Sequence, residues 1–137
     1  MREEALIYTY PYIYLTRALI PVMKKRISNG LKSGIVNISS CAATFPEAYA
    51  SVYSCSKAFE RFFSEALREE LSQTSKNFEV LTVCPKIVQT GMTLGKIDHS
   101  PATGSTSCPQ YVDYLMKAIS SATPFKQHII GPPFHSV

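Results

Sequence analysis

The chain of 137 residues lacks the cysteine patterns that mark metal sites and stapled folds, because no two of its four cysteines form a CxxC pair. The spacings between Cys41, Cys55, Cys84 and Cys108 match neither a zinc site nor the dense framework of a disulfide-rich domain. The three histidines share no metal-binding spacing either. We therefore expect free thiols, a reducing compartment and no metal.

A long hydrophobic run and a strong charge of one sign are also lacking. The longest apolar stretch, over 5–23, is interrupted by Pro11 and carries Arg17, whereas a membrane span needs roughly 18 or more consecutive apolar residues. The net charge is +4, from 14 basic and 10 acidic residues, and the only basic cluster runs from Met23 to Arg26. We expect neither a membrane span in this chain nor a nucleic-acid partner.

The sequence does contain an alternation of helical and strand patterns, and its 45% of hydrophobic residues can build a sizeable core. Apolar residues at helical spacings predict three helices, over 12–27, 51–75 and 109–120. Apolar, β-branched runs predict three strands, over 34–39, 78–84 and 127–132. The first of these strands has the pattern of one buried on both faces. Residues 86–108 lack periodicity and predict a long loop.

This alternation predicts an α/β fold with a parallel sheet built from βαβ units. Only three strands are expected, and the first element is a helix rather than a strand. A parallel sheet of this size would bury its strands poorly on both faces. The chain therefore has the pattern of the C-terminal half of a doubly wound, Rossmann-type domain.

The stretch SVYSCSKAF places a tyrosine and a lysine four residues apart at the start of a predicted helix. Residues at i and i+4 share a helix face, so Tyr53 and Lys57 can converge. A free tyrosine has a pKa of about 10, and a neighbouring ammonium would lower this pKa toward a range useful for proton transfer. Ser40 ends the preceding strand, where open α/β sheets bind ligands, and its hydroxyl could hold a substrate oxygen.

Each of these residues also has a plain structural explanation. A tyrosine and a lysine at this spacing can simply decorate a helix, and the pair becomes specific only because a serine ends the β-branched strand before it. Ser40 could be only a strand-end cap, and Pro85 only the residue that ends the strand over 78–84. Cys55 has the pattern of a small helix residue rather than of a nucleophile.

The segments GIVNISS, YSCSK and CPKIVQT resemble the short-chain dehydrogenase/reductase family. Longer stretches, NISSCAA, VYSCSKAF and VLTVCPKIVQTGMT, are similar to the 17-beta-hydroxysteroid dehydrogenase type 3 and type 12 branch, which includes very-long-chain 3-oxoacyl-CoA reductases. The similarity covers residues 6–94 and is looser in the helix and strand that follow.

The resemblance implies a role for each matched residue. Tyr53 would protonate the carbonyl oxygen of a ketone during hydride transfer from a nicotinamide cofactor. Lys57 would lower the pKa of Tyr53 and bind the ribose hydroxyls of the cofactor, and Ser40 would orient the carbonyl. Residues 91–108 would form a substrate loop. The nicotinamide side would be lined by Pro85, Val88 and Thr90.

The activity implied by the resemblance is NADP(H)-dependent reduction of a ketone on a hydrophobic small molecule, or the reverse oxidation of the alcohol. The substrate would be a steroid or a long-chain 3-oxoacyl-CoA, and NAD is the alternative cofactor. The same branch implies a location at the endoplasmic reticulum, whereas a chain that exists as residues 1–137 would be cytoplasmic.

Two departures from the family pattern bear on this activity. The six glycines never form the GxGxxG turn that binds dinucleotides, so the N-terminal dinucleotide-binding half of the domain is expected to be missing from residues 1–137. Tyr8 stands where the family's relay asparagine is expected. The chain is then either part of an active reductase or a truncated, inactive paralogue that acts through helix–helix association. A homodimer would use the helices near 5–27 and 51–75.

Overall fold

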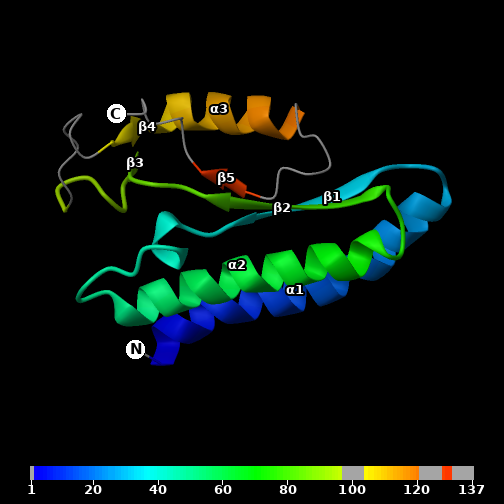
Figure 1. Ribbon diagram of the computed structural model, residues 1–137, viewed down its shortest axis with the longest axis horizontal. Coiled ribbons are helices and arrows are strands. Elements are labelled where there is room, and N and C mark those ends of the chain that lie inside the picture. The colour runs from blue at the N-terminus through cyan, green and yellow to red at the C-terminus, as the bar shows by residue number, and fades with distance from the viewer. Residues whose placement is uncertain (1, 97–103, 121–127, 131–137) are drawn as a thin grey trace.

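The computed structural model describes residues 2–96, 104–120 and 128–130 of the chain. The main sheet has three parallel strands in the order β1–β2–β5, with bounds β1 (Ser33–Ile38), β2 (Phe78–Cys84) and β5 (His128–Ile130). Two helices, α1 (Arg2–Ser28) and α2 (Ser51–Ser72), cover one face of the sheet, and α3 (Cys108–Ser120) covers the other (Figure 1). The predicted α/β fold with a parallel sheet is confirmed.

Helix α1 begins well before residue 12, the start that the pattern predicts, because the helix continues through Pro11. A second proline, Pro21, also lies inside the helix. A proline in a helix interior removes one backbone hydrogen bond and costs about 3 kcal/mol. Tertiary packing offsets this cost near the N-terminus. The ring of Tyr8 packs edge-on against that of Tyr53 in α2, with 5.5 Å between the ring centroids.

The remaining elements lie close to their predicted positions, and β2 has the predicted bounds. The long loop predicted over 86–108 is wrong in part, because it contains two short strands, β3 (Val88–Gln89) and β4 (Thr106–Ser107), which pair in parallel as a second sheet. Strands of two residues have no periodicity that a sequence pattern could reveal. Within the predicted substrate loop over 91–108, residues 97–103 lie outside the described residues.

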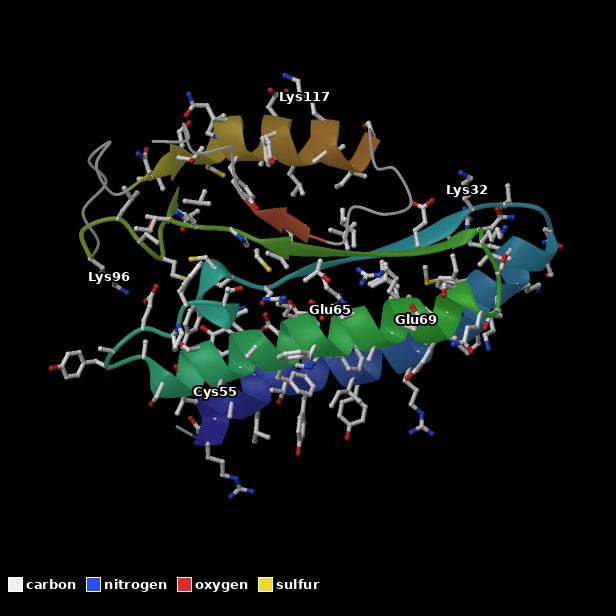
Figure 2. All side chains as sticks on the ribbon, in the orientation of Figure 1. Lys32, Cys55, Glu65, Glu69, Lys96 and Lys117 are labelled. Atoms are coloured by element: carbon white, nitrogen blue, oxygen red, sulfur yellow. The ribbon has the colours of Figure 1, made fainter. Side chains whose placement is uncertain are left out.

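Two apolar clusters hold the helices against the sheet, and the alternation of side chains along β2 separates them. Phe78 and Val80 pack on the face covered by α1 and α2, against three helix side chains, Met23, Leu67 and Leu71. Val83 points to the opposite face and packs on Tyr111 of α3. In contrast, Lys32 before β1 and Lys117 on α3 project outward (Figure 2).

Strand β1 lies at an edge of the sheet, and the face that carries Val36 and Ile38 is exposed, contrary to the prediction that the strand is buried on both faces. Val36 and Ile38 are 42% and 50% exposed, and no strand among the described residues pairs with the outer edge of β1. The N–H groups of Ser33 and Ser39 donate to β2. Because alternate residues of a strand direct their backbone groups to opposite sides, those of Val36 point away from β2.

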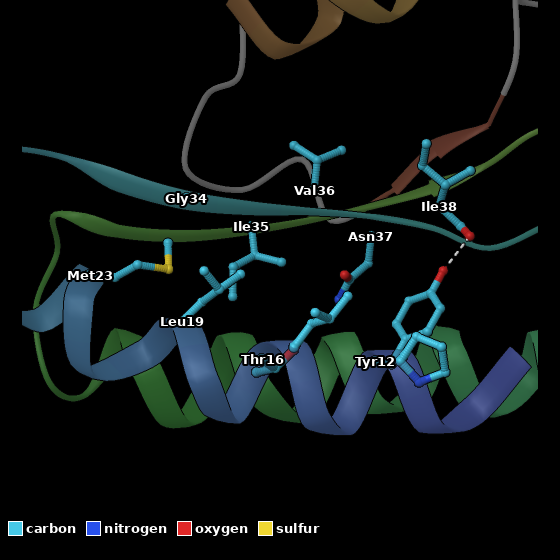
Figure 3. Close-up of a pocket in the computed structure, with 11 residues that line it drawn as sticks. Tyr12, Thr16, Leu19, Met23, Gly34, Ile35, Val36, Asn37 and Ile38 are labelled. Atoms are coloured by element: carbon cyan, nitrogen blue, oxygen red, sulfur yellow. Dashed lines mark hydrogen bonds between the residues drawn. The ribbon is translucent and has the colours of Figure 1, made fainter. Parts of the chain in front are cut away.

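A groove of about 460 Å³ runs between α1 and this edge strand (Figure 3). Thr16, Leu19 and Met23 line it from the helix, and Ile35 and Asn37 point toward it from β1. The apolar composition of β1 is typical of a strand inside a parallel sheet. Within the described residues, β1 pairs with one strand only.

Candidate active site

Ser40 lies directly after β1, at the start of a short 3₁₀ helix over Cys41–Ala43. Its backbone is extended, and its hydroxyl accepts a hydrogen bond from the N–H of Ala42 at 3.2 Å. The preceding Ser39 is buried and donates to the carbonyl of Lys57 at 2.7 Å. The carboxyl end of β1 is thus tied to the first turns of α2, and Ser40 does act as a cap.

Tyr53 lies in the first turn of α2, with its hydroxyl close enough to Ser40 for hydrogen bonding to influence its pKa. Burial raises the pKa of Tyr53 above its ordinary value of about 10. The hydrogen bond from Ser40 opposes this rise, whereas the nearby Tyr8, Glu60 and Glu47 add to it. The phenol is therefore held protonated at neutral pH, the form in which it can donate a proton.

Lys57 lies one turn further along α2, and a carboxylate that no sequence pattern singled out holds its ammonium. The Nζ atom of Lys57 lies 3.0 Å from Oε1 and 2.9 Å from Oε2 of Glu60. The same ammonium lies 4.6 Å from the ring centroid of Tyr8 and 5.5 Å from that of Tyr53, within the range of cation–π interactions. Tyr53 and Lys57 do converge, but the pKa of Tyr53 is raised rather than lowered.

The spacing of Tyr53 and Lys57 does not point to Glu60, which lies three residues after Lys57 on α2. Tyr53, Lys57, Glu60 and Ser64 follow one face of α2 at spacings of four, three and four, and the last three of them are buried. A carboxylate on the buried face of a helix, three residues after a lysine, is an unusual arrangement. This pattern is the sequence signal that could have found Glu60.

The three residues expected to contact the cofactor lie along the segment that follows β2, and only the first of them is next to the Ser40 turn. The carbonyl of Pro85 accepts the N–H of Cys41 at 2.8 Å, which puts the end of β2 beside Ser40. Val88 in β3 packs against the apolar cluster of Val83 and Tyr111, on the face of the sheet that α3 covers. The N–H of Thr90 contacts Thr93 Oγ1 at 3.1 Å, in the turn that follows β3. Pro85 is thus adjacent to the Ser40 turn, and the other two lie further along the same segment.

Within residues 2–96, 104–120 and 128–130, no group of three or more His, Cys, Asp or Glu side chains is arranged to hold a metal ion. All four cysteines are free thiols. No helix in the described part of the chain has both the length and the apolar character that crossing a membrane requires.

Comparison with known sequences gives consistent matches. A family model described as short chain dehydrogenase matches residues 7–100. The ketoacyl reductase HetN of Nostoc sp. is 41% identical over 111 residues, which are 80% of this chain and 37% of HetN. The very-long-chain 3-oxoacyl-CoA reductase of Bos taurus is 35% identical over 123 residues, which are 90% of this chain and 35% of that enzyme. The chain spans about a third of the length of these relatives.

Comparison with solved structures gives the same fold. The structure of a short chain dehydrogenase from Burkholderia cenocepacia J2315, in complex with NADP, matches with a TM-score of 0.78 and 20% sequence identity. The match covers 96% of this chain and 49% of that one. This similarity confirms the Rossmann-type fold, of which the chain forms about half.

Proposed function

Because the chain belongs to the short-chain dehydrogenase family, we propose that it carries the catalytic half of a reductase that converts a ketone to an alcohol. The observation that carries this proposal is the convergence of Ser40, Tyr53 and Lys57 at the carboxyl end of β1. The names of the Nostoc and bovine relatives favour a 3-oxoacyl thioester over a steroid as the substrate. The name of a further relative, the NADP-dependent 3-hydroxy acid dehydrogenase YdfG of Salmonella typhi, 43% identical over 63 residues, supports NADP(H) over NAD(H).

The chemistry of these side chains fits a nicotinamide cofactor, because two hydroxyls and an ammonium lie at the carboxyl ends of parallel strands, where such sheets bind ligands. When bound, a nicotinamide supplies the hydride that adds to the carbonyl carbon. The hydroxyl of Ser40 orients the carbonyl oxygen, and the hydroxyl of Tyr53 donates its proton to that oxygen. The ammonium of Lys57 would hydrogen-bond the ribose hydroxyls, and the part of its charge that Glu60 does not neutralise would stabilise the phenolate that remains.

The free edge of β1 suits the dinucleotide-binding half of the domain. Parallel strands joined through a helix follow a right-handed crossover in about 98% of cases. Since α1 and α2 lie on the same face, a strand that precedes α1 in a βαβ unit would pair with the outer edge of β1. There it would pair with the backbone groups of Val36, which point away from β2.

We expect a chimera to test this function directly. In the chimera, this chain replaces the matching segment of HetN, so that the dinucleotide-binding half is covalently present. NADPH should be oxidised in the presence of a 3-oxoacyl thioester, as followed by the loss of reduced-nicotinamide absorbance. The 137-residue chain alone serves as the control and should show no turnover. A folded chimera that binds NADPH but reduces neither 3-oxoacyl thioesters nor steroid ketones would contradict the proposal.

We propose the endoplasmic reticulum as the location of the protein, on the basis of its similarity to the bovine very-long-chain enzyme. Microscopy of the tagged chain should show overlap with a reticulum marker. A uniform cytosolic signal would contradict this location.

A second function, association with another copy of the chain, is favoured by the outer face of α2. Phe62 is 65% exposed, and a shallow groove of about 360 Å³ between α1 and α2 is lined in part by Val52, Cys55 and Phe59. Cys55 lies on the outward side of α2 (Figure 2). These four residues follow the outward side of α2 at helical spacing. Apolar surface of this kind marks interaction sites, so we propose a homodimer through α1 and α2.

Phe62→Lys is expected to convert this dimer to a monomer, because it places a charge at the centre of the apolar face. Size-exclusion chromatography with light scattering gives the mass directly. Met116→Lys is the matched control, since Met116 is 56% exposed but lies on α3, which covers the opposite face of the sheet from α1 and α2. A wild-type chain that is monomeric at all concentrations would rule out the dimer.

A further inference from the structure

Glu60 is a buried carboxylate to which the proposed reaction assigns no role. Its side chain is fully buried, at 0% residue exposure, in the middle of the inner face of α2. An ionised carboxylate is costly to bury unless it is paired and hydrogen-bonded. The ammonium of Lys57 supplies both the charge partner and the hydrogen bonds, because its Nζ atom lies 3.0 Å from Oε1 and 2.9 Å from Oε2 of Glu60.

The neighbouring helix completes the surroundings of this pair. From α1, the hydroxyl of Tyr12 lies within hydrogen-bond reach of Glu60 and donates to the carbonyl of Ile38 in β1. The ring of Tyr8, also from α1, lies 4.6 Å from the ammonium of Lys57. Burial raises the pKa of Glu60, and the hydrogen bonds and charge of its two partners oppose that rise. The carboxylate thus has one strong partner, the ammonium of Lys57, because the single hydroxyl proton of Tyr12 is donated to Ile38.

We propose that Glu60 is a positioning residue that holds the ammonium of Lys57 against the rings of Tyr8 and Tyr53 and neutralises its charge. An unpaired ammonium 5.5 Å from the ring centroid of Tyr53 would strongly favour the phenolate of that tyrosine. An ammonium paired with both oxygens of a carboxylate exerts a much weaker field at the same distance. Glu60 therefore sets how strongly the positive charge of Lys57 acts on the hydroxyl of Tyr53.

The consequence for the site rests on the proposed function. Ketone reduction starts from the protonated tyrosine, whereas alcohol oxidation starts from the phenolate. With Glu60 ionised beside Lys57, the protonated form of Tyr53 is favoured, because the phenolate would form near a neutral ion pair rather than a free cation. Glu60 thus keeps Tyr53 in the protonated form from which reduction starts, and it shifts alcohol oxidation, which needs the phenolate, to higher pH.

The experiment is a pH titration of the 137-residue chain with ¹³C-labelled tyrosine rings, followed by NMR, with the Tyr53 signal assigned from Tyr53→Phe. Glu60→Gln keeps the shape and hydrogen-bonding capacity of the side chain and removes its charge. We expect this variant to lower the pKa of Tyr53 by about one unit or more, because the ammonium is no longer neutralised. An unchanged or higher pKa of Tyr53 would overturn the proposal.

Two further variants separate this role from a merely structural one. Glu65→Gln removes a carboxylate from the same helix, one that pairs with Arg61 at 2.8 Å near the surface, and should leave the pKa of Tyr53 unchanged. In the double variant Lys57→Met/Glu60→Gln the fall should vanish, because its cause, the ammonium, is gone. An equal fall in the double variant would show that Glu60 does not act through Lys57.

If Glu60→Gln does not fold, Lys57→Met tests the proposal from the other partner. An ionised Glu60 without its ammonium should raise the pKa of Tyr53, and the absence of any rise would overturn the proposal. None of these titrations requires a cofactor or turnover. They can therefore succeed or fail independently of the reductase function.

Discussion

Replacing Tyr53 by phenylalanine is expected to lower kcat for ketone reduction by the HetN chimera by about 10³-fold, within the range that a positioned general acid contributes. The substitution removes only the hydroxyl, which lies close to Ser40. The ring remains and can keep its edge-on packing against Tyr8. We therefore expect the chimera to fold and to bind NADPH with little change in affinity.

Steady-state kinetics with a 3-oxoacyl thioester and calorimetry with NADPH measure the two effects separately. Tyr49→Phe is the matched control, because Tyr49 is fully exposed in the segment before α2 and should have no effect on kcat. A Tyr53→Phe chimera that retains most of its kcat would show that another group donates the proton.

Replacing Lys57 by methionine is expected to cost about 3 kcal/mol of unfolding free energy at neutral pH, because removing one partner of a buried ion pair leaves the other buried and unpaired. The partner is Glu60, which is fully buried. Lys117→Met is the matched control. Lys117 pairs with Asp113 at 2.7 Å, but both side chains are largely exposed (Figure 2), and such pairs contribute about 0–1 kcal/mol.

The cost of Lys57→Met should depend on pH in a definite direction. Burial raises the pKa of Glu60, and the loss of Lys57 removes a group that opposes this rise. A carboxyl whose pKa is higher in the folded than in the unfolded state stabilises the fold below the unfolded pKa, and this contribution is lost as pH rises through the folded pKa. The variant should therefore be less destabilised at mildly acidic pH than at neutral pH.

Urea denaturation followed by circular dichroism, at mildly acidic and at neutral pH, measures this difference. A loss of stability in Lys57→Met no larger than that in Lys117→Met, or one that grows toward acidic pH, would contradict the arrangement of Lys57 and Glu60.

The parts of the site that depend on local spacing were predictable from the sequence. Tyr53 and Lys57 converge because residues four apart share a helix face. Ser40 reaches them because it follows β1 by two residues, where Ser39 ties the chain to α2 and the 3₁₀ helix begins. The bounds of β2 were predictable for a similar reason, since Pro85 directly follows its apolar run.

The features that depend on tertiary partners were not predictable. The apolar pattern of β1 predicts a strand buried on both faces, but a sequence pattern does not show which elements are present to cover those faces. The predicted start of α1 is too late, because the helix continues through Pro11 to a first part whose Tyr8 packs on Tyr53 of α2. The direction of the pKa shift at Tyr53 depends on burial and on Glu60, which only the packed structure brings together.

The central claim, that the cluster of Ser40, Tyr53 and Lys57 performs ketone reduction, is tested most directly by isotope transfer. The HetN chimera is supplied with NADPH carrying deuterium at C4 of the nicotinamide, together with a 3-oxoacyl thioester, and the product is examined by mass spectrometry. We predict a deuterium-labelled 3-hydroxyacyl product from the chimera and almost none from its Tyr53→Phe variant. Equal labelling by both, or no labelled product from a folded chimera that binds NADPH, would contradict the claim.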